Sequence, residues 1–170
     1  MKLPFSISAG IAAGIIFSLS WYLIARSIGF YNGDVYLYRL FLIFGLILLG
    51  VLVCVVVTKR RGNGILEFRT ALYAGMLYCV GFAILVALFN VFYYKFITPD
   101  TIDYYMSEAK RYGENVLKVK QADMPKFLDG EKARFSSLGQ IPPILFWGGI
   151  VSLVTAALLQ KKPPHTFSEN

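Results

Sequence analysis

Four stretches of the chain are apolar over about the length of a membrane-spanning helix and carry no charged side chain in their centres. They cover residues 4–25, 36–58, 68–96 and 140–160. A helix needs about 20 apolar residues to cross a hydrocarbon core about 30 Å thick. Backbone exposed to lipid must satisfy its own hydrogen bonds, so each stretch should be helical. The sequence therefore predicts an all-α protein, an integral membrane bundle of four transmembrane helices.

The overall composition supports one membrane domain over residues 1–170. The chain contains 56% hydrophobic and 16% charged residues, whereas a soluble domain usually carries roughly 25% charged residues. A soluble core of this size could not hide so much apolar surface. The net charge of +7 does not indicate nucleic-acid binding, because the basic residues gather at the ends of the apolar stretches, where anionic lipid head groups lie. The expected partner is the lipid bilayer, with no nucleic acid.

The first apolar stretch has two interpretations, a retained helix or a cleaved signal peptide. It follows the basic Lys2, but it is longer than the apolar region of about 7–15 residues in a signal peptide. It ends through Trp21-Tyr22 and Arg26 without a convincing small-residue cleavage site. We therefore expect a retained transmembrane helix.

The distribution of lysine and arginine predicts the orientation, because short cytoplasmic loops are rich in both. The short connection between the second and third stretches contains Lys59, Arg60, Arg61 and Arg69. The connection before it contains Arg26 and Arg39, both at the edges of spans. This pattern predicts cytoplasmic termini, a cytoplasmic tail over 161–170 and an extracytoplasmic segment over 98–139.

One long segment opposes this orientation. Residues 95–134 contain eight basic and seven acidic side chains, but long loops weigh little in the rule. Aromatic residues with polar tips favour membrane interfaces. Those expected near the outer interface are Trp21, Tyr22, Tyr31, Tyr36, Tyr38, Tyr93, Tyr94 and Trp147.

Small residues recur every four positions in three of the stretches, which places them on one face of each helix. The three series are Ser6, Gly10, Gly14 and Ser18; Ala71, Gly75, Cys79, Ala83 and Ala87; and Gly148, Ser152 and Ala156. Such faces let helices pack closely in lipid. They favour packing within one bundle, and the alternative is a homo-oligomer or a contact with another membrane protein.

The segment between the third and fourth stretches predicts an amphipathic helix. Its start resembles a cap at Thr98 with Pro99 in the first turn. Its apolar side consists of Ile102, Tyr105, Met106, Ala109, Gly113, Val116 and Leu117, and its polar side of Asp103, Ser107, Lys110 and Glu114. It could lie on the membrane surface or cap the bundle, or it could dock a partner or cover a cavity. Asp123-Met124-Pro125 indicates a second short helix toward Phe135, and Ile141-Pro142-Pro143 the return to the bilayer.

No pattern of catalytic, cofactor-binding or metal-binding residues is evident, so the sequence predicts none of these sites. Cys54 and Cys79 lie inside apolar stretches and are expected to pack, and His165 stands alone in the tail. Asp100 and Asp103 are commonplace near a helix start. Asn90 is the strongest polar side chain in a span, and such groups more often bond neighbouring helices than bind a substrate.

The middle of the chain resembles the domain-of-unknown-function 4199 family. The resemblance lies in the basic turn with glycines, in Glu67-Phe68-Arg69-Thr70-Ala71-Leu72, in Gly75, and in Tyr94-Lys95-Phe96-Ile97-Thr98-Pro99-Asp100. Gly10, Gly14 and Lys161-Lys162 fit the same layout. The resemblance implies a small four-span inner-membrane protein, mainly of Bacteroidota, and carries no catalytic signature or site residues.

Uncharged spans and a structured segment outside the membrane lead to one functional hypothesis. The chain is expected to be a non-enzymatic accessory or scaffold subunit. The alternative is a small transporter or lipid-handling protein, which a polar cavity containing Asn90 would favour. An enzyme would require titratable groups that converge near Asp100.

Overall fold

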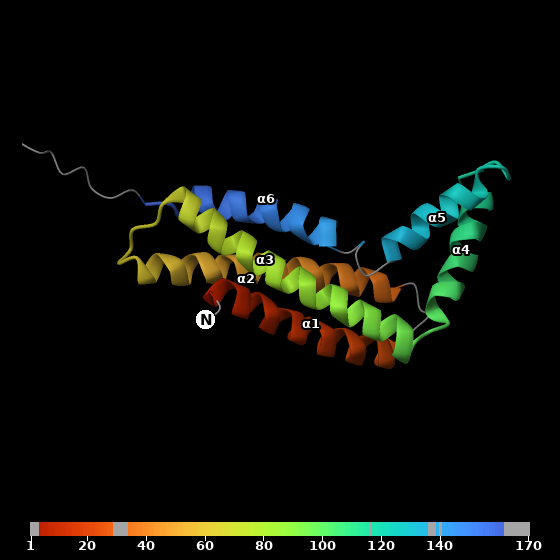
Figure 1. The fold of residues 1–170 in the computed structure, drawn as a ribbon, viewed down its shortest axis with the longest axis horizontal. Helices are drawn as coiled ribbons and strands as arrows, with labels where there is room; N and C mark the ends of the chain where they lie inside the picture. The colour runs from red at the N-terminus through yellow and green to blue at the C-terminus, as the bar shows by residue number, and fades with distance from the viewer. Residues whose placement is uncertain (1–3, 29–33, 116, 136–138, 140, 162–170) are drawn as a thin grey trace, which may run out of the picture.

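The computed structural model describes residues 4–28, 34–115, 117–135, 139 and 141–161. Its elements are all helices: α1 (Phe5–Ile28), α2 (Asp34–Arg61), α3 (Phe68–Phe92), the π-helix η1 (Tyr93–Ile97), α4 (Thr101–Asn115), α5 (Met124–Phe135) and α6 (Ile141–Leu159). Figure 1 shows α1, α2, α3 and α6 side by side, with α4 and α5 as a hairpin at one end of this bundle. The predicted all-α bundle is confirmed.

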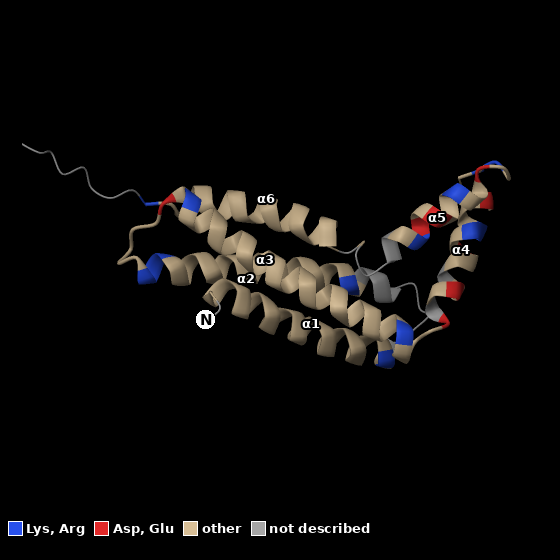
Figure 2. Cartoon of the chain, in the orientation of Figure 1, with Lys and Arg blue, Asp and Glu red and all other residues tan. Residues whose placement is uncertain are grey.

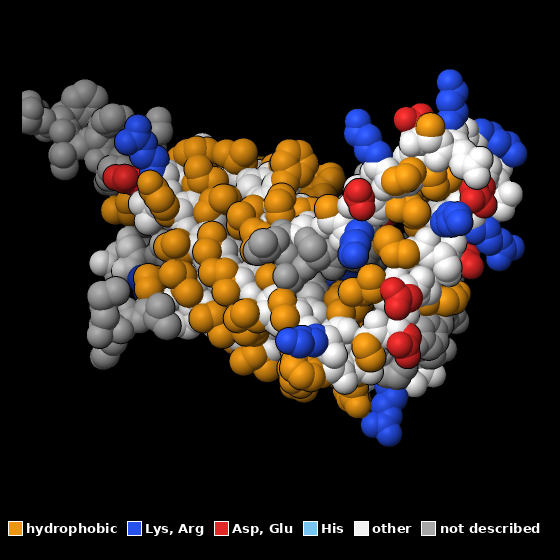
Figure 3. Space-filling view, turned by 45° about the vertical axis from the view of Figure 1, so that its right-hand side comes forward, with side chains coloured by type: hydrophobic (Ala, Val, Ile, Leu, Met, Phe, Trp, Pro, Cys, Tyr) orange, Lys and Arg blue, Asp and Glu red, His pale blue; other side chains and the backbone are white. Residues whose placement is uncertain are grey.

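Among the described residues, four helices are long and apolar enough to cross a membrane: Phe5–Ser27, Tyr38–Arg61, Phe68–Ile97 and Ile141–Leu159. The second ends at Arg61 rather than at 58, because the helix continues through three basic residues. The face of the bundle seen in Figure 3 is largely apolar, and Phe41, Tyr73 and Leu158 are each more than two-thirds exposed. The chain is a multi-pass membrane protein.

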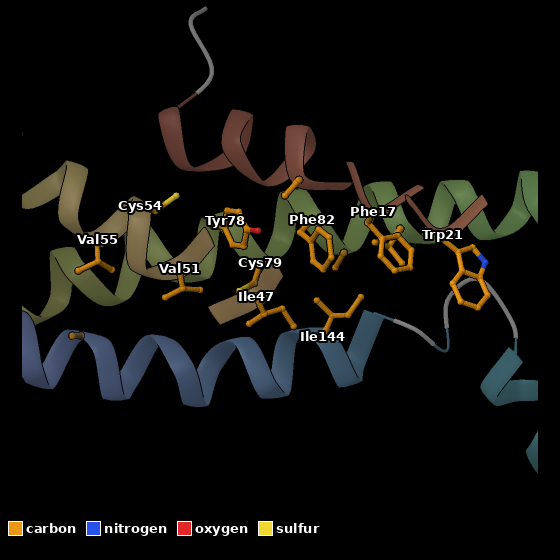
Figure 4. Packing of buried hydrophobic residues seen from close by; sticks show 14 of the residues in the cluster. Phe17, Trp21, Ile47, Val51, Cys54, Val55, Tyr78, Cys79, Phe82 and Ile144 are labelled. Atoms are coloured by element: carbon orange, nitrogen blue, oxygen red, sulfur yellow. The ribbon is translucent and has the colours of Figure 1, made fainter. Parts of the chain in front are cut away.

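Helix α3 is the centre of the bundle. Half of the residues in its 18-residue apolar stretch are buried, compared with 22–28% in the other three spanning helices. It packs against α1, α2 and α6. Figure 4 shows the result as a row of buried side chains that includes Tyr78, Phe82, Phe17 and Trp21. Because α3 contacts all three other spans, its sequence needs small residues on more than one face.

The small-residue faces pack within this chain. Gly10 of α1 lies against the backbone of α3, where an added Cβ would overlap the carbonyl oxygen of Tyr78. Gly81 of α3 faces α1 in the same way, since its Cβ would lie 2.7 Å from the carbonyl oxygen of Ile7. On the other side of α3, Gly148 of α6 lies against Cys79. The expectation of intramolecular packing therefore holds at these positions.

Tyr78 links α3 to α2 through a space that a glycine leaves open. Its ring occupies the place that a side chain at Gly50 would fill. Its hydroxyl donates a hydrogen bond of 2.7 Å to the carbonyl oxygen of Leu46. The phenol thus satisfies its polar atom inside the bundle, as a buried tyrosine must.

We expect Tyr78→Phe to lower the free energy of unfolding by about 1 kcal/mol, because it removes one buried hydrogen bond. Unfolding by sodium dodecyl sulfate in mixed micelles, followed by circular dichroism, would measure the change. Tyr73→Phe is the matched control, since the Tyr73 side chain is 69% exposed. Equal stability of Tyr78→Phe and Tyr73→Phe would show that the Leu46 contact adds nothing.

The basic end of the bundle is tied together by backbone and lysine contacts. Leu66, in the α2–α3 turn, exchanges two backbone hydrogen bonds with Lys161 after α6, of 3.0 and 2.9 Å. The Lys59 ammonium donates to the carbonyl oxygen of Leu159, at the C-terminus of α6. A cation there also favours the negative end of the helix dipole. The turn itself needs Gly64, whose φ is +83°.

The hairpin differs from its prediction at the start of its first helix. Thr98 is not a helix cap: its N–H donates to the carbonyl oxygen of Tyr93 and closes the π-helix. Helix α4 begins at Thr101, and the Asp100 carbonyl accepts its first hydrogen bond, from Tyr104. The reason is that α3 continues as η1 through Ile97, so the turn between this helix and α4 comes only after Ile97.

The second predicted short helix is present as α5, from Met124 to Phe135. Gly113 on α4 lies against Phe127 and Met124 of α5, which lets the two helices pack closely. Leu117, expected on the helical stripe, lies after the end of α4 at Asn115, and Val116 falls outside the described residues. Gly130 faces open space, so it does not interrupt α5.

Candidate functional site

The described bundle contains one arginine whose side chain turns inward. Arg39 of α2 is only 6% exposed, although its place near the start of the second span predicts a position at the edge. An arginine near a membrane interface usually extends its charged head toward water. Here the guanidinium is buried among α1, α2 and the end of α3. Arg39 does lie at the edge of its span, as expected, but its side chain points into the bundle instead of toward the loop.

Three side chains from two other helices contact the guanidinium. Nη1 donates to the hydroxyl oxygen of Tyr94 at 2.9 Å, and Nη2 donates to Oδ1 of Asn90 at 2.8 Å. The guanidinium carbon lies 5.4 Å from the centre of the Trp21 ring. This distance is within the range of a cation–π interaction, which favours a desolvated arginine. We refer to Trp21, Arg39, Asn90 and Tyr94 as the Arg39 cluster.

The π-helix explains how one helix supplies two of these contacts. Asn90 is in the last turn of α3, and Tyr93 and Tyr94 begin η1. Both tyrosines are buried although they are consecutive in the chain. A π-turn inserts an extra residue per turn and so changes which side chains share a face. It allows Asn90, Tyr93 and Tyr94 to point into the bundle together.

Aromatic rings surround the cluster rather than facing the lipid. Tyr93 lies 6.4 Å from Trp21, 5.3 Å from Tyr94 and 5.4 Å from Phe89, measured between ring centres. Trp21, Tyr93 and Tyr94 are each at least nine-tenths buried. These three side chains therefore contact other helices of the bundle, and their expected level near the outer interface stays a prediction. Tyr38 and Trp147 keep large exposed surfaces, and Tyr31 and the Tyr36 side chain fall outside what the structure describes.

The cluster is rich in donors and poor in acceptors. Nε of Arg39 and Nδ2 of Asn90 have no hydrogen-bond partner and are closed to solvent. The Tyr94 hydroxyl accepts a hydrogen bond from Arg39, and a hydroxyl can also donate its proton. Among the described side chains no carboxylate pairs with the guanidinium. An incompletely paired buried charge is costly, so an added acceptor would stabilise this cluster.

A second feature lies outside the bundle, between α4 and α5. It is an open groove of about 600 Å³. Lys110 and Glu114 of α4 line one side, and Met124, Pro125 and Leu128 of α5 line the other. The groove therefore combines both signs of charge with an apolar floor. Figure 2 shows that acidic and basic residues alternate over the hairpin, whereas the middle of the bundle carries none.

The comparisons with known proteins identify a family. The family model described as "Protein of unknown function (DUF4199)" matches residues 8–161. The chain belongs to this family. No curated protein and no solved structure shows a significant match. Family membership confirms the predicted resemblance, and the family's description supplies no activity or site residue for this chain.

The structure places the other residues singled out in the sequence as follows. Cys54 and Cys79 are buried free thiols, as expected of packing residues. Asp100 and Asp103 are exposed at the start of α4. Within the described residues, no three histidine, cysteine or acidic side chains gather where they could hold a metal ion. His165 falls outside those residues.

Sequence reasoning found one half of the Arg39 cluster and missed the other. Asn90 was identified as the strongest polar group in a span, and it does bond a neighbouring helix. The position of Arg39 at the edge of its span does not by itself indicate that the side chain turns inward. A signal was available in its neighbours, since Tyr38, Leu40 and Phe41 enclose the charge in an apolar sequence.

Proposed function

We propose that this protein is a non-enzymatic accessory or scaffold subunit of the bacterial inner membrane, which presents its α4–α5 hairpin to a partner protein outside the cytoplasm. The observation that carries the proposal is the groove between α4 and α5. Ile102, Met106, Ala109 and Gly113 form the less exposed side of α4, which supports the prediction of an amphipathic helix. Its charged side and the groove remain available to a partner.

The proposed orientation rests on the two ends of the bundle. Lys59, Arg60 and Arg61 end α2, Arg69 follows the turn, and Lys161 follows α6, so five basic residues gather at one end. Burial of Arg39 removes one basic side chain from the opposite surface. The positive-inside rule then favours a cytoplasmic location for the Lys59 end.

Cysteine labelling tests this orientation. A membrane-impermeant maleimide should label Glu108→Cys in intact cells and should label Asn63→Cys only after the membrane is opened. Both positions are exposed, whereas the native Cys54 and Cys79 are buried and should not react. Labelling of Asn63→Cys alone in intact cells would mean that the orientation is reversed. Equal labelling of both variants would contradict a topology with the two positions on opposite sides of the membrane.

Purification in a mild detergent tests the partner role. We expect a defined complex larger than the chain itself, and we expect it to dissociate when the groove charges are reversed in Lys110→Glu/Glu114→Lys. The matched control is Lys132→Glu on the exposed side of α5, outside the lining of the groove. A strictly monomeric protein, or a complex that the groove variant leaves intact, would contradict the accessory role.

The alternative function, a small transporter or lipid-handling protein, has one observation in its favour. The Arg39 cluster is a buried positive centre at one end of the spans, and ionisable groups inside membranes often mark binding or transport sites. Asn90 itself is 1% exposed and bonded to Arg39, and it is not among the residues that line the α4–α5 groove or the apolar grooves at Leu19, Gly50 and Phe44. The observation therefore favours ligand binding over passage through the bundle.

A further inference from the structure

We infer that the Arg39 cluster is a binding site for a phosphate group, carried by a lipid head group or free in solution. This inference does not involve the α4–α5 hairpin, and it does not depend on a partner protein. It starts from the imbalance of hydrogen-bonding groups around one buried cation. The two polar atoms of Arg39 and Asn90 that have no partner, Nε and Nδ2, are both donors.

The donors are of the kind that recognises an oxyanion. The guanidinium presents a rigid fork of N–H groups that matches the oxygens of a phosphate. Its Nε and the Asn90 amide nitrogen are both without a partner, and both side chains are at least nine-tenths buried. A cation could not bind among these groups, because Arg39 would repel it. A neutral acceptor would leave the charge of Arg39 uncompensated.

The depth of the cluster fits a group at the membrane surface. Helix α2 begins at Asp34, and no charged residue follows Arg39 in it until Lys59. Arg39 therefore lies at the end of the hydrocarbon region, close to the level at which phospholipid phosphates are found. The rest of the bundle at this level is aromatic, which lowers the local dielectric and strengthens an ion pair once it forms.

An apolar groove lies next to the cluster. It has a volume of about 430 Å³, lies between α1 and α3, and is lined by Leu19, Tyr22, Leu85, Phe89 and Phe92 among others. Phe89 contacts Tyr93, and Tyr93 contacts Trp21 and Tyr94. One ring thus separates the groove from the Arg39 cluster. A lipid could lay an acyl chain in this groove while its phosphate approaches the guanidinium.

Both unpartnered nitrogens are closed to solvent in this structure. Binding therefore requires a side chain of the cluster to move. The Tyr94 hydroxyl, which now accepts from Nη1, would instead donate its proton to a phosphate oxygen. The exchange replaces one neutral acceptor with a charged one, which forms the stronger hydrogen bond with a guanidinium.

Tryptophan fluorescence can report on this site, because the chain has two tryptophans and one of them lies under the guanidinium. In a Trp147→Phe background, Trp21 is the sole indole. Its emission should change and saturate on addition of inorganic phosphate in a maltoside detergent, or on reconstitution into digalactosyldiacylglycerol vesicles that contain phosphatidylglycerol, compared with vesicles that lack phosphate. A response to free phosphate identifies the soluble source. A response to phosphatidylglycerol alone identifies the head group.

Variants decide whether the response belongs to Arg39. Arg39→Gln should abolish it, and Lys95→Gln should preserve it, since Lys95 is an exposed cation at the same end of the bundle. If Arg39→Gln does not fold, Arg39→Lys keeps the charge without the fork and should weaken apparent binding about tenfold. No change in Trp21 emission with either phosphate source overturns the inference. An equal response in the Arg39 variants and in the parent protein overturns it as well.

Discussion

Gly10→Ala is expected to destabilise the bundle by about 2–3 kcal/mol, since overpacking at a close contact forces the backbone to shift. An alanine Cβ at this position would overlap the carbonyl oxygen of Tyr78 and lie 2.9 Å from the backbone nitrogen of Phe82. Both atoms belong to the backbone of α3, so no side-chain rotation can relieve the overlap. Helices α1 and α3 must separate, and in lipid close backbone packing is a main source of association energy.

Gly45→Ala is the matched control for this substitution. Gly45 lies in the interior of α2, and a Cβ there would meet no atom within 4 Å. Both substitutions gain the same intrinsic helix propensity, about 1 kcal/mol in water. The difference between the two variants therefore isolates the α1–α3 contact. Unfolding in mixed micelles would measure it, and similar stabilities would mean that α1 does not pack on α3 through Gly10.

The second large effect is expected at Asn90. Asn90→Leu removes the oxygen that accepts from Nη2 of Arg39 and should cost about 2–3 kcal/mol, because a buried charged group loses a partner. The double variant Arg39→Met/Asn90→Leu removes the charge as well. It should be no less stable than Asn90→Leu alone, since replacing a whole buried polar set by apolar groups is often neutral or favourable.

A double-mutant cycle measures this coupling between α2 and α3. The single variants Arg39→Met and Asn90→Leu, the double variant and the parent protein would be unfolded under the same conditions. We expect the two losses to be clearly non-additive. Additive losses would show that Arg39 and Asn90 act independently, and would contradict the hydrogen bond between them. A second pair, Arg39→Met with Tyr73→Phe, supplies the additive reference, because Tyr73 is exposed on another part of α3.

The order of the secondary structure could be predicted because it depends on local composition. A stretch such as 140–160 is uncharged and about the length of a bilayer crossing, and this property alone makes it a helix in lipid. The short helix after Asp123 was predicted from its start, and the structure contains it as α5. The small-residue face of α1 was predicted from its four-residue spacing, which the α-helix converts directly into a shared side.

The start of α4 shows where local rules fail. Thr98-Pro99 has the composition of a helix cap, but α3 continues into a π-helix that uses the Thr98 N–H. The hydropathy pattern does not predict the change from an α-turn to a π-turn. The π-turn is stabilised here by tertiary contacts, because it allows two consecutive tyrosines and Asn90 to be buried together.

Length, charge and residue spacing were sufficient to predict the four helical spans and the small-residue faces on which they pack, because the bilayer acts on each span separately. The direction of the Arg39 side chain could not be predicted in this way. Whether that arginine extends to water or turns inward depends on Trp21, Asn90 and Tyr94, which three helices bring together, and residues 51 and 55 positions apart share no local signal.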